Sequence, residues 1–326
     1  MTLSKLAQLA NVLVSVVSKA FSGRNDISDT MREHVFSVAR ANGCFHQFYH
    51  ARYDKPVIAV IVPEVISKYY IRYIEFLKKS IEESGYTMLL SISNFDKQLT
   101  EELIRYYTEY GKVDGMIIVD GNASYSKDIK TTIVAITAIS NTEIEVRIEH
   151  SMRSALREVI ELLYSMGHRR IAYIGEALTD GKRRILVEEV SRLGIDILPE
   201  YFYSSRMRFE DAGRDGVEAI FSNDREAPTA VFGAYGYITQ GIISALTERG
   251  YSIPEDVSVI SMDSDPAPLD PCLDVAYIDS DNERACAEAI RMLKSRIGVQ
   301  NPNSPAVVKH IATLHLGETV SHAKTK

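Results

Sequence analysis

The sequence predicts an α/β protein whose body holds parallel β-sheets in two similar halves, preceded by a small domain of short helices. The chain has 326 residues, which is enough for about two domains. The segment PVIAVIVP, residues 56–63, is a continuous β-branched run of the kind found in buried parallel strands. From there to the C-terminus strand and helix patterns alternate, and repeated strand–helix–strand units build parallel sheets with helices on both faces.

The first 43 residues fit three short helices. Apolar residues recur at helical spacing from Leu3 onward, and Asn11 can adopt the positive φ that ends a first helix. A second helix fits residues 14–22 and stops at Gly23. Ser28, followed by an acidic residue, is a typical N-cap for a third helix. This segment is therefore predicted to be a helical domain.

The rest of the chain alternates between strands and helices. Strands are expected at residues 56–63, 87–92, 115–121, 133–137, 170–175, 201–204, 229–233, 257–263 and 307–314. Helices are expected at residues 69–84, 97–110, 151–166, 180–193, 211–222, 238–249 and 281–296. The alternation restarts near residue 150, so two α/β halves are expected. Ligands of such folds bind at the carboxyl ends of the parallel strands.

Charge and cysteine usage narrow the class of protein. The net charge is −7, yet residues 1–55 hold seven basic and four acidic residues, a local charge of +3. A basic head on an acidic body points to an anionic partner, with a solvated face as the alternative. Cys44, Cys272 and Cys286 are scattered, as is typical of free thiols in the cytoplasm. The chain shows no long apolar run and no signal peptide, so no membrane association is expected.

Four short stretches of the N-terminal segment resemble one known family. They are Thr2-Leu3, Ala10-Asn11-Val12-Leu13, Val16-Val17-Ser18-Lys19 and Ile27-Ser28-Asp29-Thr30-Met31-Arg32. In this order and spacing they are similar to the helix-turn-helix headpiece of the lac repressor (LacI/GalR) family of transcription regulators. In a helix-turn-helix the second helix lies in the major groove of DNA, where its early side chains reach base edges.

The body carries landmarks of the same family. They are Val113-Asp114-Gly115, Gly167-His168-Arg169-Arg170-Ile171-Ala172 and Ile253-Pro254-Glu255-Asp256-Val257-Ser258-Val259-Ile260, followed by Asp263. Because His168 lies within such a landmark, it is expected to have a structural role at a helix–strand turn.

The resemblance also implies a domain organisation. A helix-turn-helix DNA-binding headpiece and hinge are expected at residues 1–55, joined to a two-lobed, periplasmic-binding-protein-like body with parallel sheets at residues 56–326. The N-terminal lobe is expected at about 56–150 plus 280–326, and the C-terminal lobe at about 151–279. The body is expected to bind an effector and to form the dimer.

The resemblance assigns DNA contacts within the headpiece. The residues expected to contact DNA are Thr2, Val14, Ser15, Ser18, Lys19 and Tyr53. Val14, Ser15 and Lys19 would face bases, and Ser18 a phosphate. Val14 is limited to apolar contact, for example with a thymine methyl group, and Lys19 replaces the usual arginine but can still donate to guanine. Leu13 stands where the family usually has a phosphate-binding serine.

The hinge differs from the family pattern. The stretch from Cys44 to Tyr53 lacks the usual Pro and Asn. Tyr53 falls near the position of a leucine that wedges into the minor groove, as apolar side chains do in other DNA-bending proteins. The alternative is an aromatic linker that packs on the body.

The family binds a small effector in the cleft between its lobes, and two aromatic residues here match it. Tyr69 and Tyr70 fall where the family has an aromatic pair that stacks on a sugar or base. Packing in the core is the alternative role for both.

The polar part of the effector site is altered. Arg183 is expected as the basic residue of the clamp, in a register that leaves its neighbours Lys182 and Arg184 open. Tyr235 replaces part of an Asn-Asp pair whose aspartate accepts sugar hydroxyls, and Asp263 is retained. The effector is expected to be a sugar, or a sugar phosphate if Arg183, Arg184, Arg206 and Arg208 bind an anion instead of facing solvent.

No catalytic arrangement is recognisable in the sequence. Residues 175–182 differ from a phosphate-binding P-loop because five residues separate the glycines and Arg183 follows the lysine. The sequence has no serine-nucleophile elbow and no clustered metal ligands. We therefore expect no enzyme, no metal ion and no cofactor.

These features predict a cytoplasmic, homodimeric regulator that binds operator DNA and represses carbohydrate-utilisation genes under control of an effector. One alternative is a ligand-binding module whose headpiece no longer reads DNA, because the usual Ser, Pro and Asn are lost. The other is a regulator controlled by a partner protein, because the Asn-Asp pair is lost. A coiled-coil tetramer is not expected, because the tail SHAKTK has no leucine heptads.

Overall fold

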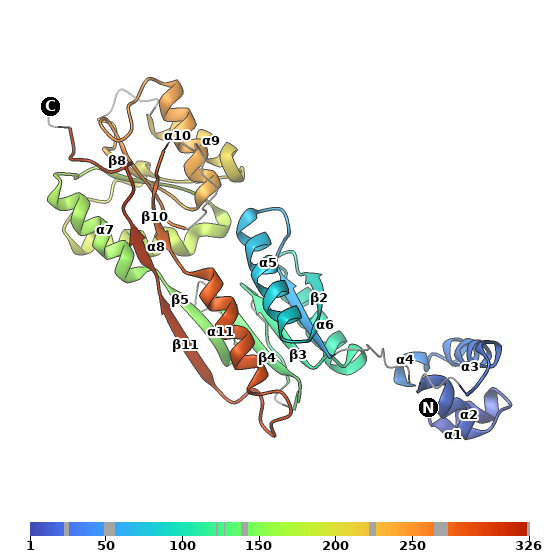
Figure 1. Ribbon diagram of the computed structural model, residues 1–326. Coiled ribbons are helices and arrows are strands. Elements are labelled where there is room, and N and C mark those ends of the chain that lie inside the picture. Colours follow the sequence, from blue (N-terminus) through green and yellow to red (C-terminus); the bar gives the residue numbers. More distant parts are fainter. Residues whose placement is uncertain are drawn as a thin grey trace. The chain divides into compact units, whose positions relative to one another are not determined.

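The chain forms two compact units, each made of more than one stretch of sequence (Figure 1). The computed structural model describes residues 1–22, 26–48, 56–121, 123–126, 128–137, 143–221, 226–263 and 273–324. The first unit comprises Met1–Thr137, Asn141–Ile148 and Cys286–Val307. The second comprises Ala138–Ser140, Glu149–Ala285 and Val308–Lys326.

The N-terminal segment is a small helical headpiece with its own core. Its helices are α1 (Leu3–Leu9), α2 (Val14–Phe21), α3 (Asp29–Ala41) and the single turn α4 (Phe45–Phe48). Ser28 accepts a hydrogen bond from the Met31 backbone N–H at 3.2 Å, which confirms it as the N-cap of α3. Asn11 has the expected positive φ, +51°, between α1 and α2. The core includes Leu6, Ala7, Val17, Ala20, Val35, Phe36 and Ala39.

In the described part of the chain, the first sheet has six strands in the order β11-β5-β4-β3-β1-β2. The strands are β1 (Val57–Val62), β2 (Thr87–Ile92), β3 (Gly115–Val119), β4 (Thr132–Thr137), β5 (Val146–Ser151) and β11 (Ala306–Ile311). β1 pairs in parallel with β2 and β3, and β3 pairs in parallel with β4. Every residue of β1, β3 and β4 is buried, as their apolar sequences predict.

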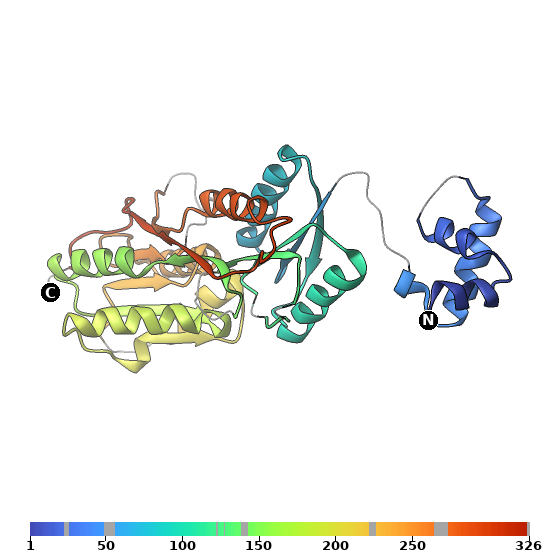
Figure 2. The same ribbon diagram turned by 90° about the horizontal axis from the view of Figure 1, so that it is seen from below.

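Helices cover both faces of the first sheet. Figures 1 and 2 show α5 (Lys68–Glu83) and α11 (Asn282–Lys294) on one face and α6 (Lys97–Tyr106) on the other. A π-helical turn, η1 (Tyr107–Gly111), ends α6. The carboxyl ends of β1 and β3 therefore open toward the loops that precede α5 and follow Val119.

The described part of the second sheet also has six strands, in the order β12-β10-β9-β8-β6-β7. The strands are β6 (Ile171–Glu176), β7 (Phe202–Ser205), β8 (Ala230–Gly233), β9 (Ser258–Ser261), β10 (Ala276–Asp279) and β12 (Thr313–His315). All described pairings are parallel except that of β10 with β12. The helices are α7 (Arg153–Ser165), α8 (Asp180–Arg192), α9 (Phe209–Phe221) and α10 (Gly236–Glu248), with 3₁₀ turns η2 (Ala177–Thr179) and η3 (Pro199–Tyr201).

The sequence missed two strands and joined two others. β5 carries charged residues and β10 is only four residues long, so neither has the apolar run that marks a buried strand. The strand expected at 307–314 is instead β11 and β12, separated by Ala312. Residues 308–326, assigned from sequence to the first lobe, group with the second unit. The reason is that β12 pairs with β10 and the Val259 N–H donates to the Thr319 carbonyl at 2.9 Å.

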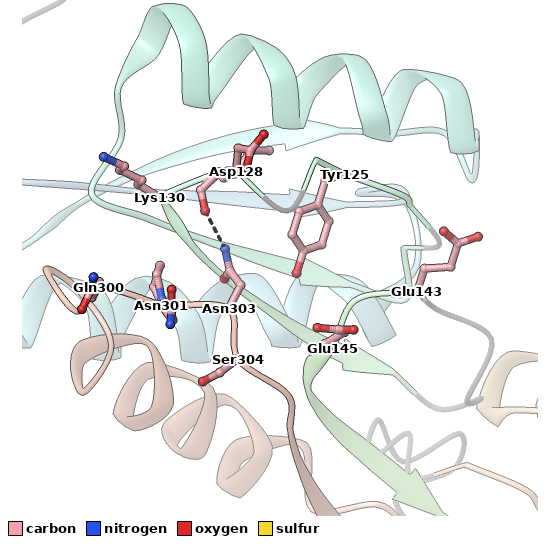
Figure 3. A pocket seen from close by; sticks show the side chains of 11 residues that line it. Tyr125, Asp128, Lys130, Glu143, Glu145, Gln300, Asn301, Asn303 and Ser304 are labelled. Carbon is pink, nitrogen blue, oxygen red and sulfur yellow. Dashed lines mark hydrogen bonds between the residues drawn. The ribbon is translucent and has the colours of Figure 1, made fainter.

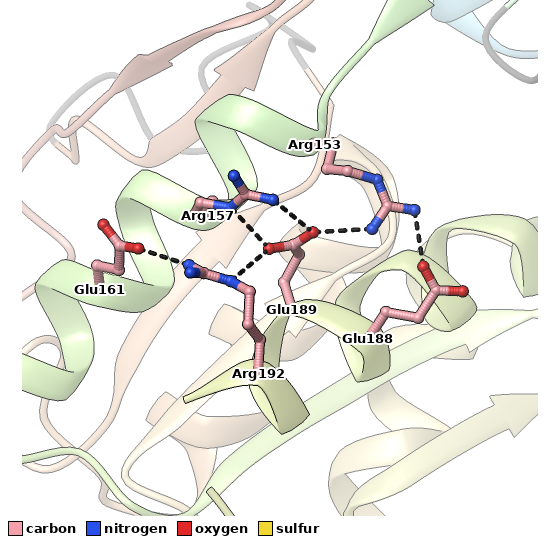
Figure 4. Close-up of polar contacts among 6 residues, drawn as sticks. All are labelled: Arg153, Arg157, Glu161, Glu188, Glu189 and Arg192. Carbon is pink, nitrogen blue, oxygen red and sulfur yellow. Dashed lines mark hydrogen bonds and ion pairs between the residues drawn. The ribbon is translucent and has the colours of Figure 1, made fainter. Parts of the chain in front are cut away.

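A buried carboxylate joins α7 and α8. Glu189 is 3% exposed and accepts hydrogen bonds from Arg153 at 2.8 Å, Arg157 at 2.9 Å and Arg192 at 3.2 Å (Figure 4). Arg153 also donates to Glu188 at 2.7 Å. The hydrogen bond from Arg157, followed by that from Arg153, lowers the pKa of Glu189 to about 2 despite its burial. The network therefore depends on the charge of Glu189.

Candidate functional site

The exposed face of α2 carries three of the six residues expected to contact DNA. Val14, Ser15 and Ser18 are exposed, whereas Val17 and Ala20 on the opposite face are buried in the headpiece core. This separation follows from the helical period, since residues one turn apart share a face. The geometry therefore leaves these three side chains available to a partner.

Three other residues expected at the DNA have different surroundings. Lys19 is half-buried, and its ammonium lies 2.7 Å from the Asp26 carboxylate, so a base contact would compete with this ion pair. Thr2 is the N-cap of α1 and accepts a hydrogen bond from the Lys5 backbone N–H at 3.2 Å. Tyr53 lies outside the described residues.

In the first unit, the two tyrosines expected to bind effector lie together at the start of α5. Their rings meet edge-to-face with centroids 4.9 Å apart. Tyr70 is buried and its hydroxyl donates to Asp120, just after β3, at 3.3 Å. Burial, followed by the nearby Asp120 charge, raises the pKa of Tyr70 well above its usual range. Tyr69 is half-buried, so Tyr70 packs in the core while part of Tyr69 faces solvent.

In the second unit, Asp263 is held by Lys182, which the sequence left open as an alternative to Arg183. Lys182, in the first turn of α8, donates to Asp263 Oδ2 and to the Ala234 carbonyl, both at 2.9 Å. Arg183 instead pairs with Asp180 at 3.1 Å, with 42% of its side chain exposed. The other carboxylate oxygen, Asp263 Oδ1, is buried and has no hydrogen-bond partner in the described part of the chain. An acceptor in that state is suited to a donor on a ligand.

Tyr235 belongs to a second polar contact at the same edge of the sheet. Its hydroxyl donates to Glu176 Oε1 at 2.8 Å and accepts from the Phe209 backbone N–H at 3.3 Å. Arg208 lies 3.3 Å from Glu176 Oε2. Burial, followed by the Glu176 charge, raises the pKa of Tyr235 above its usual range. Glu176 was missed from the sequence, although its place at the carboxyl end of β6 was a usable signal.

The cations of this edge are already matched by carboxylates. Lys182 faces Asp263, and Arg208 faces Glu176. A phosphate would have to compete with these carboxylates for either cation, whereas a hydroxyl can donate to Asp263 Oδ1 without disturbing the pairs. The pairing of both cations therefore favours a neutral polar group over a phosphate at this edge.

A polar hollow of about 750 Å³ lies elsewhere in the first unit, between the segment leading to β4 and the turn before β11 (Figure 3). Asn303 joins these segments: its amide donates to the carbonyls of Ile129 and Thr131, and its oxygen accepts from the Ile133 N–H at 2.8 Å. Tyr125 and three carboxylates also line the hollow. None of the residues predicted to bind DNA or effector lies there.

No helix in the described residues is both long and apolar enough to cross a membrane. The same residues contain no group of three or more His, Cys, Asp or Glu side chains that could hold a metal ion.

Comparison with known proteins finds a domain model that matches part of the body and relatives that match most of the chain. Residues 160–320 match the model of a periplasmic binding protein-like domain. The HTH-type transcriptional regulator DegA of Bacillus subtilis is 24% identical over 281 residues, covering 81% of each chain. The HTH-type transcriptional repressor CytR of Escherichia coli is 24% identical over 276 residues, covering 81% of this chain and 80% of CytR.

Two solved structures share the fold over nearly the whole chain. The lac repressor dimer bound to operator and the anti-inducer ONPF aligns with a TM-score of 0.69 at 16% identity, covering 98% of this chain and 99% of that one. The complex of the transcriptional regulator CelR with cellobiose aligns with a TM-score of 0.66 at 20% identity and the same coverage.

The fold is that of a helix-turn-helix headpiece followed by a periplasmic-binding-protein-like body of two α/β units, and structures of LacI-family transcriptional regulators share it. Over about four fifths of its length the chain is similar in sequence to regulators of this family.

Proposed function

We propose that this protein is a sequence-specific DNA-binding repressor of carbohydrate-utilisation genes whose affinity for its operator changes with a small-molecule effector. The exposed face of α2 carries the proposal, because Val14, Ser15 and Ser18 are exposed on the second helix of the headpiece, and a helix-turn-helix inserts its second helix into the major groove. The relatives support it: CytR is named as a transcriptional repressor, and the lac repressor structure contains operator DNA.

A neutral, hydroxyl-bearing ligand suits the second unit better than a sugar phosphate. Lys182 and Arg208 are each matched by a carboxylate, and Asp263 Oδ1 has an unused acceptor position. The cellobiose bound by CelR supports a ligand of this class. The effector is therefore proposed to be an uncharged sugar that donates a hydroxyl to Asp263.

The active form is proposed to be a cytoplasmic homodimer without enzymatic activity. Two headpieces would occupy the half-sites of a near-palindromic operator, and the operator lies in the cytoplasm. The relatives are regulators, which supports a role in binding rather than catalysis.

Selection of bound duplexes from a random DNA pool at near-physiological salt tests DNA recognition. Recovery of a near-palindrome is the expected result. Equal binding of all duplexes, with an affinity that depends only on salt, would contradict sequence-specific regulation. The protein would then be better described as a ligand-binding module whose headpiece no longer recognises DNA sequence.

Thermal unfolding with added ligands tests the effector class. Because a ligand that binds only the folded state stabilises it by mass action, neutral sugars are expected to raise the melting temperature more than their phosphates. Asp263→Asn is expected to weaken this stabilisation, with Arg183→Ala as the matched control on α8. If no sugar shifts the wild-type melting temperature, a partner protein becomes the better candidate for the controlling signal.

A further inference from the structure

Two exposed apolar side chains stand at the start of α2. Leu13 is 74% exposed and Val14 is 43% exposed, whereas Val17, Ala20 and Phe21 of the same helix are buried. The headpiece core is thus complete without Leu13 and Val14. Because Leu13 and Val14 are adjacent, they form a small continuous apolar patch at the start of the helix, which a partner could cover.

Leu13 is also an unfavourable residue for the helix itself. It is the N-cap of α2, and the helix has no side-chain cap hydrogen bond there. Ser, Thr, Asp and Asn are preferred at this position because their oxygens satisfy a backbone N–H at the helix start. By contrast, Ser28 caps α3 in this way. The leucine therefore sits at a place where the isolated headpiece gains nothing from it.

The positive charge of the N-terminal segment indicates which kind of partner would cover these side chains. Residues 1–55 carry a charge of +3, while the chain as a whole carries −7. A basic domain on an acidic protein favours an anionic partner such as DNA. Leu13 and Val14 can neither donate nor accept a hydrogen bond. On the base edges of the major groove, the apolar group available to such side chains is the C5-methyl group of thymine.

We propose that Leu13 and Val14 form a methyl-reading surface that selects 5-methylpyrimidines in the major groove. This inference rests on the proposed function and specifies what the headpiece recognises. Ser15 and Ser18, exposed on the same helix, supply the polar contacts beside it. Each half-site therefore contains thymine at the positions that meet the start of α2.

Base analogues that change only the methyl group test this surface. Once a half-site has been selected, each thymine is replaced by uracil, and binding is measured by titration of labelled duplex. At one or two positions the affinity is expected to fall about three- to five-fold, the effect of about one buried methyl group. Where T·A is replaced by C·G, the duplex with 5-methylcytosine is expected to bind more tightly than the duplex with cytosine, by a similar three- to five-fold factor. Uniform tolerance of uracil at every position overturns the proposal.

Variants assign the effect to the two side chains. Each of the variants Val14→Ala and Leu13→Ala is expected to lose the preference for thymine over uracil at the base pair that the replaced side chain contacts. Leu9→Ala is the matched control, because Leu9 is 44% exposed at the end of α1, and it should keep the full preference for thymine. Circular dichroism checks that each headpiece is folded.

The possible outcomes distinguish failure of the methyl-reading surface from failure of the proposed DNA-binding function. A specific half-site whose thymines tolerate uracil overturns the methyl-reading surface and leaves the DNA-binding regulator intact. Failure to recover any half-site overturns both. A preference for thymine that survives in both alanine variants assigns the reading to other residues and also overturns the inference.

Discussion

Two aspartates follow strands at the carboxyl edges of the two sheets, and one described contact of each differs in its chemistry. In the first unit, Asp120 accepts a hydrogen bond from the neutral hydroxyl of Tyr70 at 3.3 Å. In the second, Asp263 lies 2.9 Å from the ammonium of Lys182. A buried ion pair makes each partner depend on the other, because removing one leaves an uncompensated charge. A hydrogen bond to a neutral hydroxyl has a smaller penalty when broken.

The two edges therefore differ in what breaking a contact would cost. At the first edge a hydrogen bond to a neutral hydroxyl can be broken at modest cost. At the second edge ion pairs hold the side chains, and Asp263 Oδ1 is buried without a hydrogen-bond partner in the described part of the chain. Stability measurements on single variants test this contrast.

Removing Lys182 should have the largest effect. Lys182→Met leaves Asp263, whose side chain is 9% exposed, without its cation, and is expected to destabilise the second unit by about 3 kcal/mol. Urea unfolding followed by circular dichroism measures this change. The double variant Lys182→Met/Asp263→Asn should recover most of the loss. If the single variant is as stable as wild type, the ion pair does not organise the edge.

Glu189 tests whether ion pairing is a general device of the second unit. Its pKa of about 2 lies below the usual 4.5, so its contribution is full above pH 4.5 and disappears as the pH falls toward about 2. Glu189→Gln is expected to lose up to about 3 kcal/mol at pH 7, with some discount because the arginines are partly exposed. The variant should also lose much of the acid sensitivity between pH 4.5 and 2, as unfolding at a series of pH values would show. Parallel pH profiles for variant and wild type would argue against this role.

Tyr70→Phe tests the first edge. The variant keeps the buried ring and loses the hydroxyl that donates to Asp120, so a loss of about 1 kcal/mol is expected. The same unfolding experiment measures it. A loss as large as that of Lys182→Met would remove the contrast between the two edges.

Arg183→Ala should have the smallest effect on stability. Arg183 and Asp180 form an exposed pair one turn apart on α8, and such pairs contribute less than about 0.5 kcal/mol. The variant is the neighbour control for Lys182→Met in thermal unfolding. A large loss here would mean that the start of α8 as a whole, and not Lys182, holds the edge.

Local features of the fold were predictable from the sequence because short-range chemistry decides them. Helix ends at Gly85 and Gly167 have φ of +83° and +89°, which glycine adopts without strain. His168 was expected to be structural, and its ring nitrogens lie 2.9 Å from Thr229 Oγ1 and 2.8 Å from the Ser321 carbonyl oxygen. β5 escaped detection because its charged residues break the apolar pattern.

The polar contacts of the second unit were harder to predict because they join distant segments. Glu176 and Tyr235 meet because β6 and β8 are neighbours, with Ile174 opposite Gly233. Lys182 and Arg183 are adjacent in sequence, yet successive residues on a helix point about 100° apart. Without the helix register, sequence alone left open which of them faces Asp263.

The place of β11 in the first sheet has a consequence for synthesis on the ribosome. β11 is a neighbour of β5, but it is made about 150 residues after β5 ends. At about 5–20 residues per second, the nascent first sheet waits roughly 10 to 30 s with an open edge at β5. Open strand edges pair readily with other chains. The headpiece has its own core and precedes both sheets in the chain, so it can fold long before β11 is made.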